Sequence, residues 1–224
     1  MSHSSWHSYW REQDFASTTA LRAQLKNMRR QLDPDYAREA AAVVCRRLLE
    51  QLGPTPGRVG VYLSGKGELS LDPLIAELQR QPGTVIYAPR VVDAQRMEFR
   101  HLPDKPEMIE VNRYGLREPP AQANAIEPGR LDWLLMPLLG FDHLGHRLGM
   151  GGGYYDRALA DCREQSRPRR IGIGFAQQQV ERLTQQPWDV PCHAILTPAG
   201  WYHCASRTTS RARQAKETPP WPTG

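Results

Sequence analysis

Apolar residues recur at helical spacing near the start of the chain and form one stripe of a helix, with basic residues on the other faces. The stripe consists of Leu21, Leu25, Met28 and Leu32. Asp33 and Pro34 then have the sequence of an N-cap followed by proline in the first turn. They predict a second helix that ends near Leu52, where Gly53 follows.

Short apolar runs follow these helices and predict buried strands over residues 58–63, 84–88, 131–136 and 170–175. Asp72-Pro73 indicates the start of another helix, and residues 155–162 have a helical pattern. Residues 102–129, rich in proline and glutamate, predict a long excursion with little regular structure. Strands that alternate with helices indicate an α/β fold, a mostly parallel sheet flanked by helices in three layers (α/β/α).

Length and charge limit the organisation further. A chain of 224 residues can form one substantial core, which we place in a single domain over residues 15–204. No apolar run approaches the ~18 residues of a membrane helix, and residues 1–14 lack the apolar region of a secretory signal. The formal net charge is +5, much of it in residues 205–224. We expect a cytoplasmic protein, no membrane partner, and disordered ends at 1–14 and 205–224.

The cysteines do not form a metal motif. Cys45, Cys162, Cys192 and Cys204 are scattered without the spacing of a zinc module. Cys192-His193 and His203-Cys204 would place adjacent ligands on one ion, which strains a tetrahedral site. We therefore predict reduced thiols.

One apparent phosphate motif fails on its chemistry. Residues 60–66 fit the first part of a P-loop, but Gly67 stands where a hydroxyl should bind magnesium. The middle of the segment also has the pattern of a strand rather than a loop. We reject this motif.

A glycine-rich segment carries the stronger signal. Between Arg147 and Asp156 the sequence reads RLGMGGGYYD, with glycines at 149 and 151–153 that free the backbone N–H groups to face an anion. Arg147 offers a guanidinium fork for phosphate oxygens, and Asp156 offers a hard oxygen ligand for Mg²⁺. Nucleotide phosphate binding is the better hypothesis, and a glycine-rich turn with a solvated aspartate is the alternative.

The segment from Pro137 to Arg157, PLLGFDHLGHRLGMGGGYYDR, closely resembles the signature of the 5-formyltetrahydrofolate cyclo-ligases. The resemblance extends to LSGKGE at 63–68, NRYGLREP at 112–119 and WDVPCHAILTP at 188–198, and it covers residues 18–200. It implies ATP-dependent ring closure of 5-formyltetrahydrofolate to 5,10-methenyltetrahydrofolate, with release of ADP and phosphate. The implied route phosphorylates the formyl oxygen and then lets N10 attack the activated carbon.

The resemblance also implies roles for individual residues. It gives catalytic roles to Arg147 and Tyr154 and metal ligation to Asp156 and Asp189. The implied ATP-binding residues are Thr18, Thr19, Ala20, Leu21, Arg22, Arg147, Leu148, Gly149, Met150, Gly151, Gly152, Gly153, Tyr154 and Tyr155. The implied folate-binding residues are Arg22, Leu63, Glu68, Met150, Gly151, Gly152, Gly153 and Tyr154.

Local sequence alone leaves alternatives open at several of these positions. Asp189 could be a turn residue, Glu68 a solvated loop residue, and either tyrosine a core aromatic, Tyr155 more so than Tyr154. The chain also departs from the family pattern, with Thr18 where a lysine is common and Gly152 where some members carry lysine.

The leading hypothesis is an ATP- and Mg²⁺-dependent ligase that acts on a reduced folate as a monomer. One alternative is a paralogue of the same fold with another substrate. A second is a nucleic-acid-binding protein that uses the basic tail, although the body lacks interleaved basic and aromatic residues.

Overall fold

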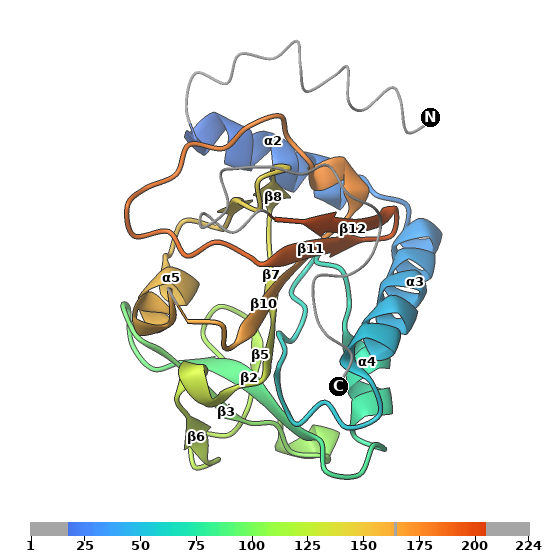
Figure 1. The fold of residues 1–224 in the computed structure, drawn as a ribbon, viewed down its shortest axis with the longest axis vertical. Helices are drawn as coiled ribbons and strands as arrows, with labels where there is room; N and C mark the ends of the chain where they lie inside the picture. Colours follow the sequence, from blue (N-terminus) through green and yellow to red (C-terminus); the bar gives the residue numbers. More distant parts are fainter. Residues whose placement is uncertain (1–17, 164, 205–224) are drawn as a thin grey trace.

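The computed structural model describes residues 18–163 and 165–204, so the expected extension at 1–14 and the tail at 205–224 lie outside the described residues. One eight-stranded sheet forms the centre of the molecule, in the order β12-β11-β10-β7-β1-β2-β3-β6 (Figure 1). Its strands are β1 Arg58–Gly60, β2 Val85–Val91, β3 Met97–His101, β6 Ala125–Ile126, β7 Trp133–Pro137, β10 Arg169–Ile173, β11 Ala194–Thr197 and β12 Gly200–His203.

The centre of the sheet is parallel and its edges are antiparallel. Strands β11, β10, β7, β1 and β2 pair in parallel, whereas β3 and β6 at one edge and β12 at the other pair antiparallel. The four predicted strands are the central ones β1, β2, β7 and β10. The continuous apolar runs of β7 and β10 reflect burial on both faces, whereas β2 alternates half-buried and buried residues. The prediction of a mostly parallel sheet flanked by helices is confirmed.

Helices cover both faces of the sheet (Figure 1). Helices α3 (Pro34–Leu52) and α4 (Asp72–Leu78) bury one apolar cluster, which includes Val44, Leu48 and Leu74. Helix α5 (Tyr154–Ala158) and the 3₁₀ turn η3 (Ala160–Cys162) lie over the other cluster, built on residues such as Phe99 and Leu134. Helix α2 (Thr18–Arg30) packs its apolar stripe into a third, smaller cluster.

Local signals set the boundaries of α3. The Asp33 carboxylate accepts the N–H groups of Asp35 and Tyr36, which are otherwise unsatisfied in a first helical turn. The helix ends at Leu52, and Gly53 follows with a positive φ of 73°. Among the described residues, no helix is long and apolar enough to cross a membrane.

Strand β2 runs through Pro89 instead of ending there. Its parallel pairing with β1 extends only to Tyr87, so beyond that residue β2 has β3 as its neighbour on one side alone. The missing N–H of Pro89 therefore leaves no ladder partner unsatisfied on the open side. Strand β1 is correspondingly shorter than the predicted run, ending at Gly60 instead of residue 63.

The excursion at 102–129 contains only short elements, as predicted. They are η1 Pro106–Met108, β4 Glu110–Val111, β5 Arg117–Glu118, the edge strand β6 and η2 Pro128–Arg130, which begins at the end of the excursion. Strands β4 and β5 pair with each other to form a hairpin. A second small hairpin, β8 (Gly140–Phe141) with β9 (Arg147–Leu148), leads into the glycine-rich segment, and the 3₁₀ turn η4 (Ala176–Gln178) follows β10.

Candidate active site

The candidate residues gather where the central parallel strands end. Three connections meet there: the Glu68 loop (residues 64–68) after β1, residues 92–95 after β2, and the glycine loop (residues 149–153) that follows β9. Helix α2 lies across this end of the sheet, beside the β8–β9 hairpin (Figure 1). Ligands of open α/β sheets bind at the carboxyl ends of the strands. The candidate residues lie at that end of this sheet.

The glycine loop has a backbone that needs glycine at two of its positions. Gly151 has φ of 102° and Gly153 has φ of 65°, both in the region that side chains with a Cβ rarely adopt. Gly149, in contrast, has open space around the position of a Cβ. The helix that follows, α5, has only five residues, so its dipole contributes less to anion binding than the predicted helix over 155–162 would.

Arg147 and Asp156 contact each other at the two ends of this segment. Arg147 Nη2 donates to Asp156 Oδ1 over 2.7 Å, and the arginine side chain is only 7% exposed. The Nε of Arg147 is buried and has no hydrogen-bond partner. The predicted phosphate ligand therefore has one N–H without a partner, and its charge is compensated by the predicted metal ligand.

The segment that carries Asp189 folds back onto Asp156. The backbone N–H of Val190 donates to Asp156 Oδ1 over 3.0 Å, which places the residue next to Asp189 in direct contact with the first carboxylate. Asp189 itself accepts the N–H of Gln186 at 2.8 Å through Oδ2. The two carboxylates come from regions that are remote in sequence, and the fold brings their segments together.

This donor set fits Mg²⁺ bound together with a nucleotide. Among the described residues, no group of three or more histidine, cysteine, aspartate or glutamate side chains could hold a metal by itself. Mg²⁺ at nucleotide sites uses one or two carboxylates and completes its shell with phosphate oxygens and water. Asp156 and Asp189 supply hard oxygens of that kind.

Arg22 of α2 lies against the glycine loop. Its Nε donates to the carbonyl oxygen of Gly149 over 3.0 Å, and a Cβ added at Gly151 would lie 3.6 Å from its Cζ. The other predicted ATP-binding residues of α2 and β9 differ in how exposed their side chains are. Thr18, Thr19 and Ala20 are exposed at the start of α2, whereas the side chains of Leu21 and Leu148 are core residues. These two leucines can reach a ligand only through their backbone.

The Glu68 loop is held in a tight turn. Glu68 Oε2 accepts the N–H of Gly65 over 2.8 Å, and the N–H of Glu68 donates to the carbonyl of Gly65 over 3.0 Å. Glu68 Oε1 lies 3.8 Å from Nη1 of Arg29 on α2. Leu63, the last residue before this loop, is half-buried. Glu68 is therefore a fixed carboxylate and not the solvated side chain that local sequence favours.

The two tyrosines of the glycine-rich segment have different surroundings. Tyr155 packs edge-on against Phe99, and its buried hydroxyl has no hydrogen-bond partner. Burial raises the pKa of Tyr155, and the charge of Glu68 raises it further. Tyr154 instead donates its hydroxyl to the carbonyl of Asp93 over 3.3 Å.

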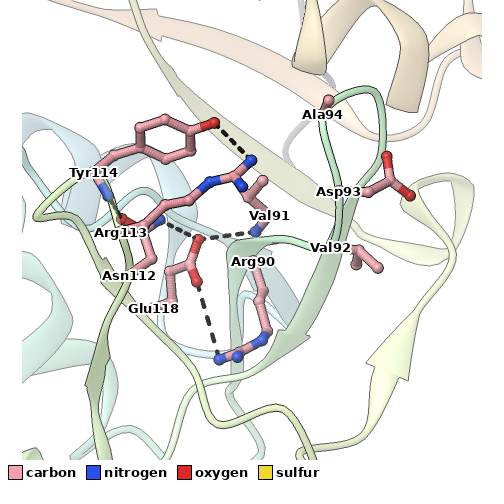
Figure 2. Close-up of a pocket in the computed structure, with 9 residues that line it drawn as sticks. All are labelled: Arg90, Val91, Val92, Asp93, Ala94, Asn112, Arg113, Tyr114 and Glu118. Carbon is pink, nitrogen blue, oxygen red and sulfur yellow. Dashed lines mark hydrogen bonds and ion pairs between the residues drawn. The ribbon is translucent and has the colours of Figure 1, made fainter.

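A cavity of about 530 Å³ lies between the end of β2 and the β4–β5 hairpin (Figure 2). It is lined by Arg90, Val91, Val92, Asp93, Ala94, Asn112, Arg113, Tyr114 and Glu118. Buried Glu118 organises its floor by accepting the N–H of Val91 and the amide of Asn112. Tyr114 is 56% exposed, and the Arg113 guanidinium lies 4.9 Å from the centre of its ring.

This cavity is joined to both loops. The Tyr154 hydroxyl reaches Asp93 in the cavity wall, and Leu116 of the hairpin would lie 3.1 Å from a Cβ at Gly65. Sequence reasoning assigned no role to residues 90–94 or to Tyr114. The signal available was an aromatic residue beside an arginine in the turn of NRYG, which by itself is typical of many exposed turns.

The chain is similar to known proteins over most of its length. The profile of the 5-formyltetrahydrofolate cyclo-ligase family matches residues 14–198. The chain is 34% identical over 179 residues to the 5-formyltetrahydrofolate cyclo-ligase of Escherichia coli K12, covering 78% of this chain and 97% of that protein. It is 33% identical over 181 residues to the Haemophilus influenzae protein of the same name, covering 79% and 95%.

Two solved structures share the fold. One is the NMR structure of a 5,10-methenyltetrahydrofolate synthetase from Aquifex aeolicus, with a TM-score of 0.72, 24% identity, and coverage of 89% of this chain and 96% of that one. The other is a 5,10-methenyltetrahydrofolate synthetase from Mycoplasma pneumoniae, with a TM-score of 0.66, 25% identity, and coverage of 81% and 99%.

Proposed function

Because the chain belongs to the 5-formyltetrahydrofolate cyclo-ligase family, we propose that it converts 5-formyltetrahydrofolate to 5,10-methenyltetrahydrofolate at the expense of ATP. The observation that carries the proposal is the junction at the end of the sheet. There the glycine loop is joined to the wall of the cavity of Figure 2 through Tyr154, and the Glu68 loop lies against the hairpin beside that cavity at Leu116. A nucleotide and a flat heterocyclic substrate can thus be held next to each other.

The glycine loop and Arg22 form the nucleotide side of the proposed site. Exposed backbone at Gly151 and Gly152 can turn N–H groups toward phosphate oxygens, and Arg147 can add donors from within the site. Phosphoryl transfer requires positioning and neutralisation of charge more than a protein nucleophile. Arg147 is assigned that role, with Tyr154 connecting the loop to the cavity wall.

Asp156 and Asp189 are assigned as the ligands of Mg²⁺. The ion would supply neutralisation of phosphate charge. Asp156 would then exchange part of its contact with Arg147 for the ion, which would release guanidinium donors toward the nucleotide.

The Glu68 loop and the cavity form the folate side. Glu68 can accept hydrogen bonds from the N–H groups of the pterin ring, and Leu63 provides apolar contact beside it. Tyr114 and Arg113 offer flat surfaces at the rim of the cavity. In the overall reaction, the γ-phosphoryl group moves to the formyl oxygen and N10 bonds to the formyl carbon. That oxygen leaves with the phosphate, and N10 loses its proton.

We further propose a monomer in the cytoplasm. All four cysteines lie among the described residues as free thiols, and those at 45, 162 and 192 are buried. Reduced, buried thiols are typical of that compartment.

The direct test is the appearance of methenyltetrahydrofolate absorbance when 5-formyltetrahydrofolate, ATP and Mg²⁺ are added to the full chain. Omission of each component in turn is the control, and each omission should abolish the signal. Binding of ATP without turnover of this folate would contradict the proposal and favour a paralogue with another substrate.

A further inference from the structure

Two arginines on one face of α2 reach the two loops of the site. Arg22 and Arg29 are seven positions apart, which is close to two helical turns, so they project from the same side of the helix. Arg22 contacts the glycine loop through the carbonyl of Gly149. Arg29 contacts the Glu68 loop.

Arg29 lies against three consecutive residues of that loop. Its Nη2 donates to the carbonyl of Lys66 over 3.3 Å, and its Nη1 lies 3.8 Å from Glu68 Oε1. A Cβ at Gly67 would lie 3.5 Å from Nε of Arg29. Gly67 has φ of 77°, so the turn that brings the loop onto the guanidinium depends on a glycine.

Arg29 is costly to place where it is. The side chain is 8% exposed, and burial lowers the pKa of Arg29, an effect that the charge of Glu68 opposes. Burial of a charged group destabilises a fold unless its partners compensate. Within α2 the other buried positions are apolar, so packing alone would favour an apolar residue here as well.

Glu68 gains a defined orientation from this contact. Its Oε2 is held by the N–H of Gly65, and its Oε1 faces Arg29. The two contacts together restrict both carboxylate oxygens, which leaves their remaining lone pairs in a set direction. A carboxylate held in this way can accept hydrogen bonds from a ligand without first losing its own mobility.

We infer that Arg29 is a positioning residue for the folate substrate, which holds the Glu68 loop and the Glu68 carboxylate in the binding geometry. The inference rests on the proposed function, because it needs Glu68 to contact the pterin ring. Arg29 acts only through Glu68 and its loop, and it is not a catalytic residue.

The first experiment measures the loop without any substrate. Hydrogen–deuterium exchange is followed in a peptide that spans residues 63–69 of the full chain, for Arg29→Met and for Arg30→Met. Arg30 is the exposed neighbour on the same helix and provides the matched control. We expect exchange in this peptide to become about 10-fold faster in Arg29→Met and to stay unchanged in Arg30→Met. Unchanged exchange in Arg29→Met would overturn the inference.

The second experiment separates folate binding from nucleotide binding. Arg29→Met should raise KM for 5-formyltetrahydrofolate by about 10-fold, the effect of losing one charge-assisted contact, while KM for ATP stays within about 2-fold. Arg29→Lys keeps the charge but not the fork, and it should recover part of the loss. It also serves as the folded variant if Arg29→Met proves unstable. Equal rises in both KM values would indicate general damage and overturn the inference.

A double variant distinguishes this inference from the proposed function. Arg29→Met combined with Glu68→Gln should be no worse than Glu68→Gln alone, because Arg29 acts through Glu68. If Glu68→Gln raises KM for the folate and Arg29→Met does not, the role of Arg29 is wrong and the proposed folate site stands. If Glu68→Gln leaves KM unchanged, the folate assignment of Glu68 fails, and with it the inference that depends on it.

Discussion

The Glu68 loop and the glycine loop lie at the same end of the sheet but are held in different ways. The Glu68 loop is closed by reciprocal contacts between Gly65 and Glu68 and is covered by the buried Arg29. The glycine loop is exposed at Met150, Gly151 and Gly152, and its carbonyls at Gly149 and Gly152 accept hydrogen bonds from Arg22 and Arg157. The Glu68 loop is thus held by side-chain contacts around a turn with one glycine at positive φ, whereas the glycine loop has such glycines at two positions and lacks a closing carboxylate of its own.

The charged side chains at the two loops also differ in how closely they are paired. Oε1 of Glu68 lies 3.8 Å from Nη1 of Arg29, beyond hydrogen-bond distance, so the carboxylate can still accept a hydrogen bond from a ligand. Nη2 of Arg147 and Oδ1 of Asp156, in contrast, are 2.7 Å apart. A ligand can therefore bind at Glu68 without breaking an existing ion pair, but the proposed nucleotide and metal must rearrange one. The difference indicates a preorganised folate side and a nucleotide side that is completed by its ligands.

The largest effect is expected when the Asp156 carboxylate, which pairs with Arg147 beside the glycine loop, is removed. Asp156→Asn should lower kcat/KM by at least ~100-fold, because the proposed metal loses a charged ligand and Arg147 loses its partner. Initial rates at several Mg²⁺ concentrations measure the effect. Asp161→Asn, an exposed aspartate in η3, is the matched control. Wild-type turnover of Asp156→Asn at saturating Mg²⁺ would remove Asp156 from the site.

On the preorganised side, Glu68→Gln should raise KM for 5-formyltetrahydrofolate by roughly 10- to 150-fold, since a charge-assisted hydrogen bond contributes roughly 1.5–3 kcal/mol. KM for ATP should change little. Steady-state kinetics with each substrate varied in turn give both values, with exposed Glu77→Gln as the control. Parallel increases in both constants would mean that Glu68 supports the fold and not the folate.

The backbone of the glycine loop can be tested at the position of its largest positive φ. Gly151→Val should weaken ATP binding by about 10-fold or more, because a β-branched residue at φ of 102° is strained and would crowd the phosphate side. The melting temperature should fall only modestly, since the residue is exposed. Calorimetric titration with ATP measures the affinity. Gly149→Ala, with open space around it, should bind nearly as the wild type does; equal losses in both variants would contradict the comparison.

The smallest effect is expected outside both loops, at His193 beside β10 and β11. Burial, with Arg170 and Arg169 nearby, lowers the pKa of His193 to about 4 from an ordinary value of 6.5. The unfolded chain therefore binds the proton first as the pH falls. This contribution to stability is complete above pH 6.5 and is lost between pH 6.5 and 4.

Because His193 is only partly buried, we expect the loss to be roughly 1–2 kcal/mol. Urea midpoints at pH 7 and pH 4.5 measure it, and His193→Gln should flatten the difference between them. If the difference between the two urea midpoints in His193→Gln equals that of the wild type, other groups cause the loss of stability in acid. It would leave the comparison of the two loops untouched.

Much of the fold follows from local pattern. The sequence predicts the apolar stripe of α2, the N-cap at Asp33 and the four central strands, because each depends on residues close together in sequence. Strands β3, β6, β11 and β12, which lie at or next to the two edges of the sheet, were not predicted. Each has only two to five residues, too few for a clear local pattern, so its pairing with a neighbouring strand decides whether it forms at all.

For the candidate site too, the sequence predicts the features that depend on residues close together in the chain. The glycine loop with Arg147 and Asp156 could be picked out from the residues alone, because phosphate binding needs glycines and charges at short spacing. Glu68 and Asp189 were proposed only through resemblance, since nothing in their immediate sequence marks them. The cavity beside Tyr114 was assigned no role, because its two walls are separate segments of the chain.

By itself, then, the sequence determined the class of fold, the glycine loop and the chemistry that the loop can perform. Only the tertiary structure decided that the segment of Asp189 contacts Asp156, that Arg29 holds the Glu68 loop, and that Tyr154 joins the glycine loop to the cavity. The physical reason is distance along the chain. Hydrogen bonds and caps within a few residues leave a local pattern, whereas contacts between remote loops exist only after the parallel strands have aligned their carboxyl ends.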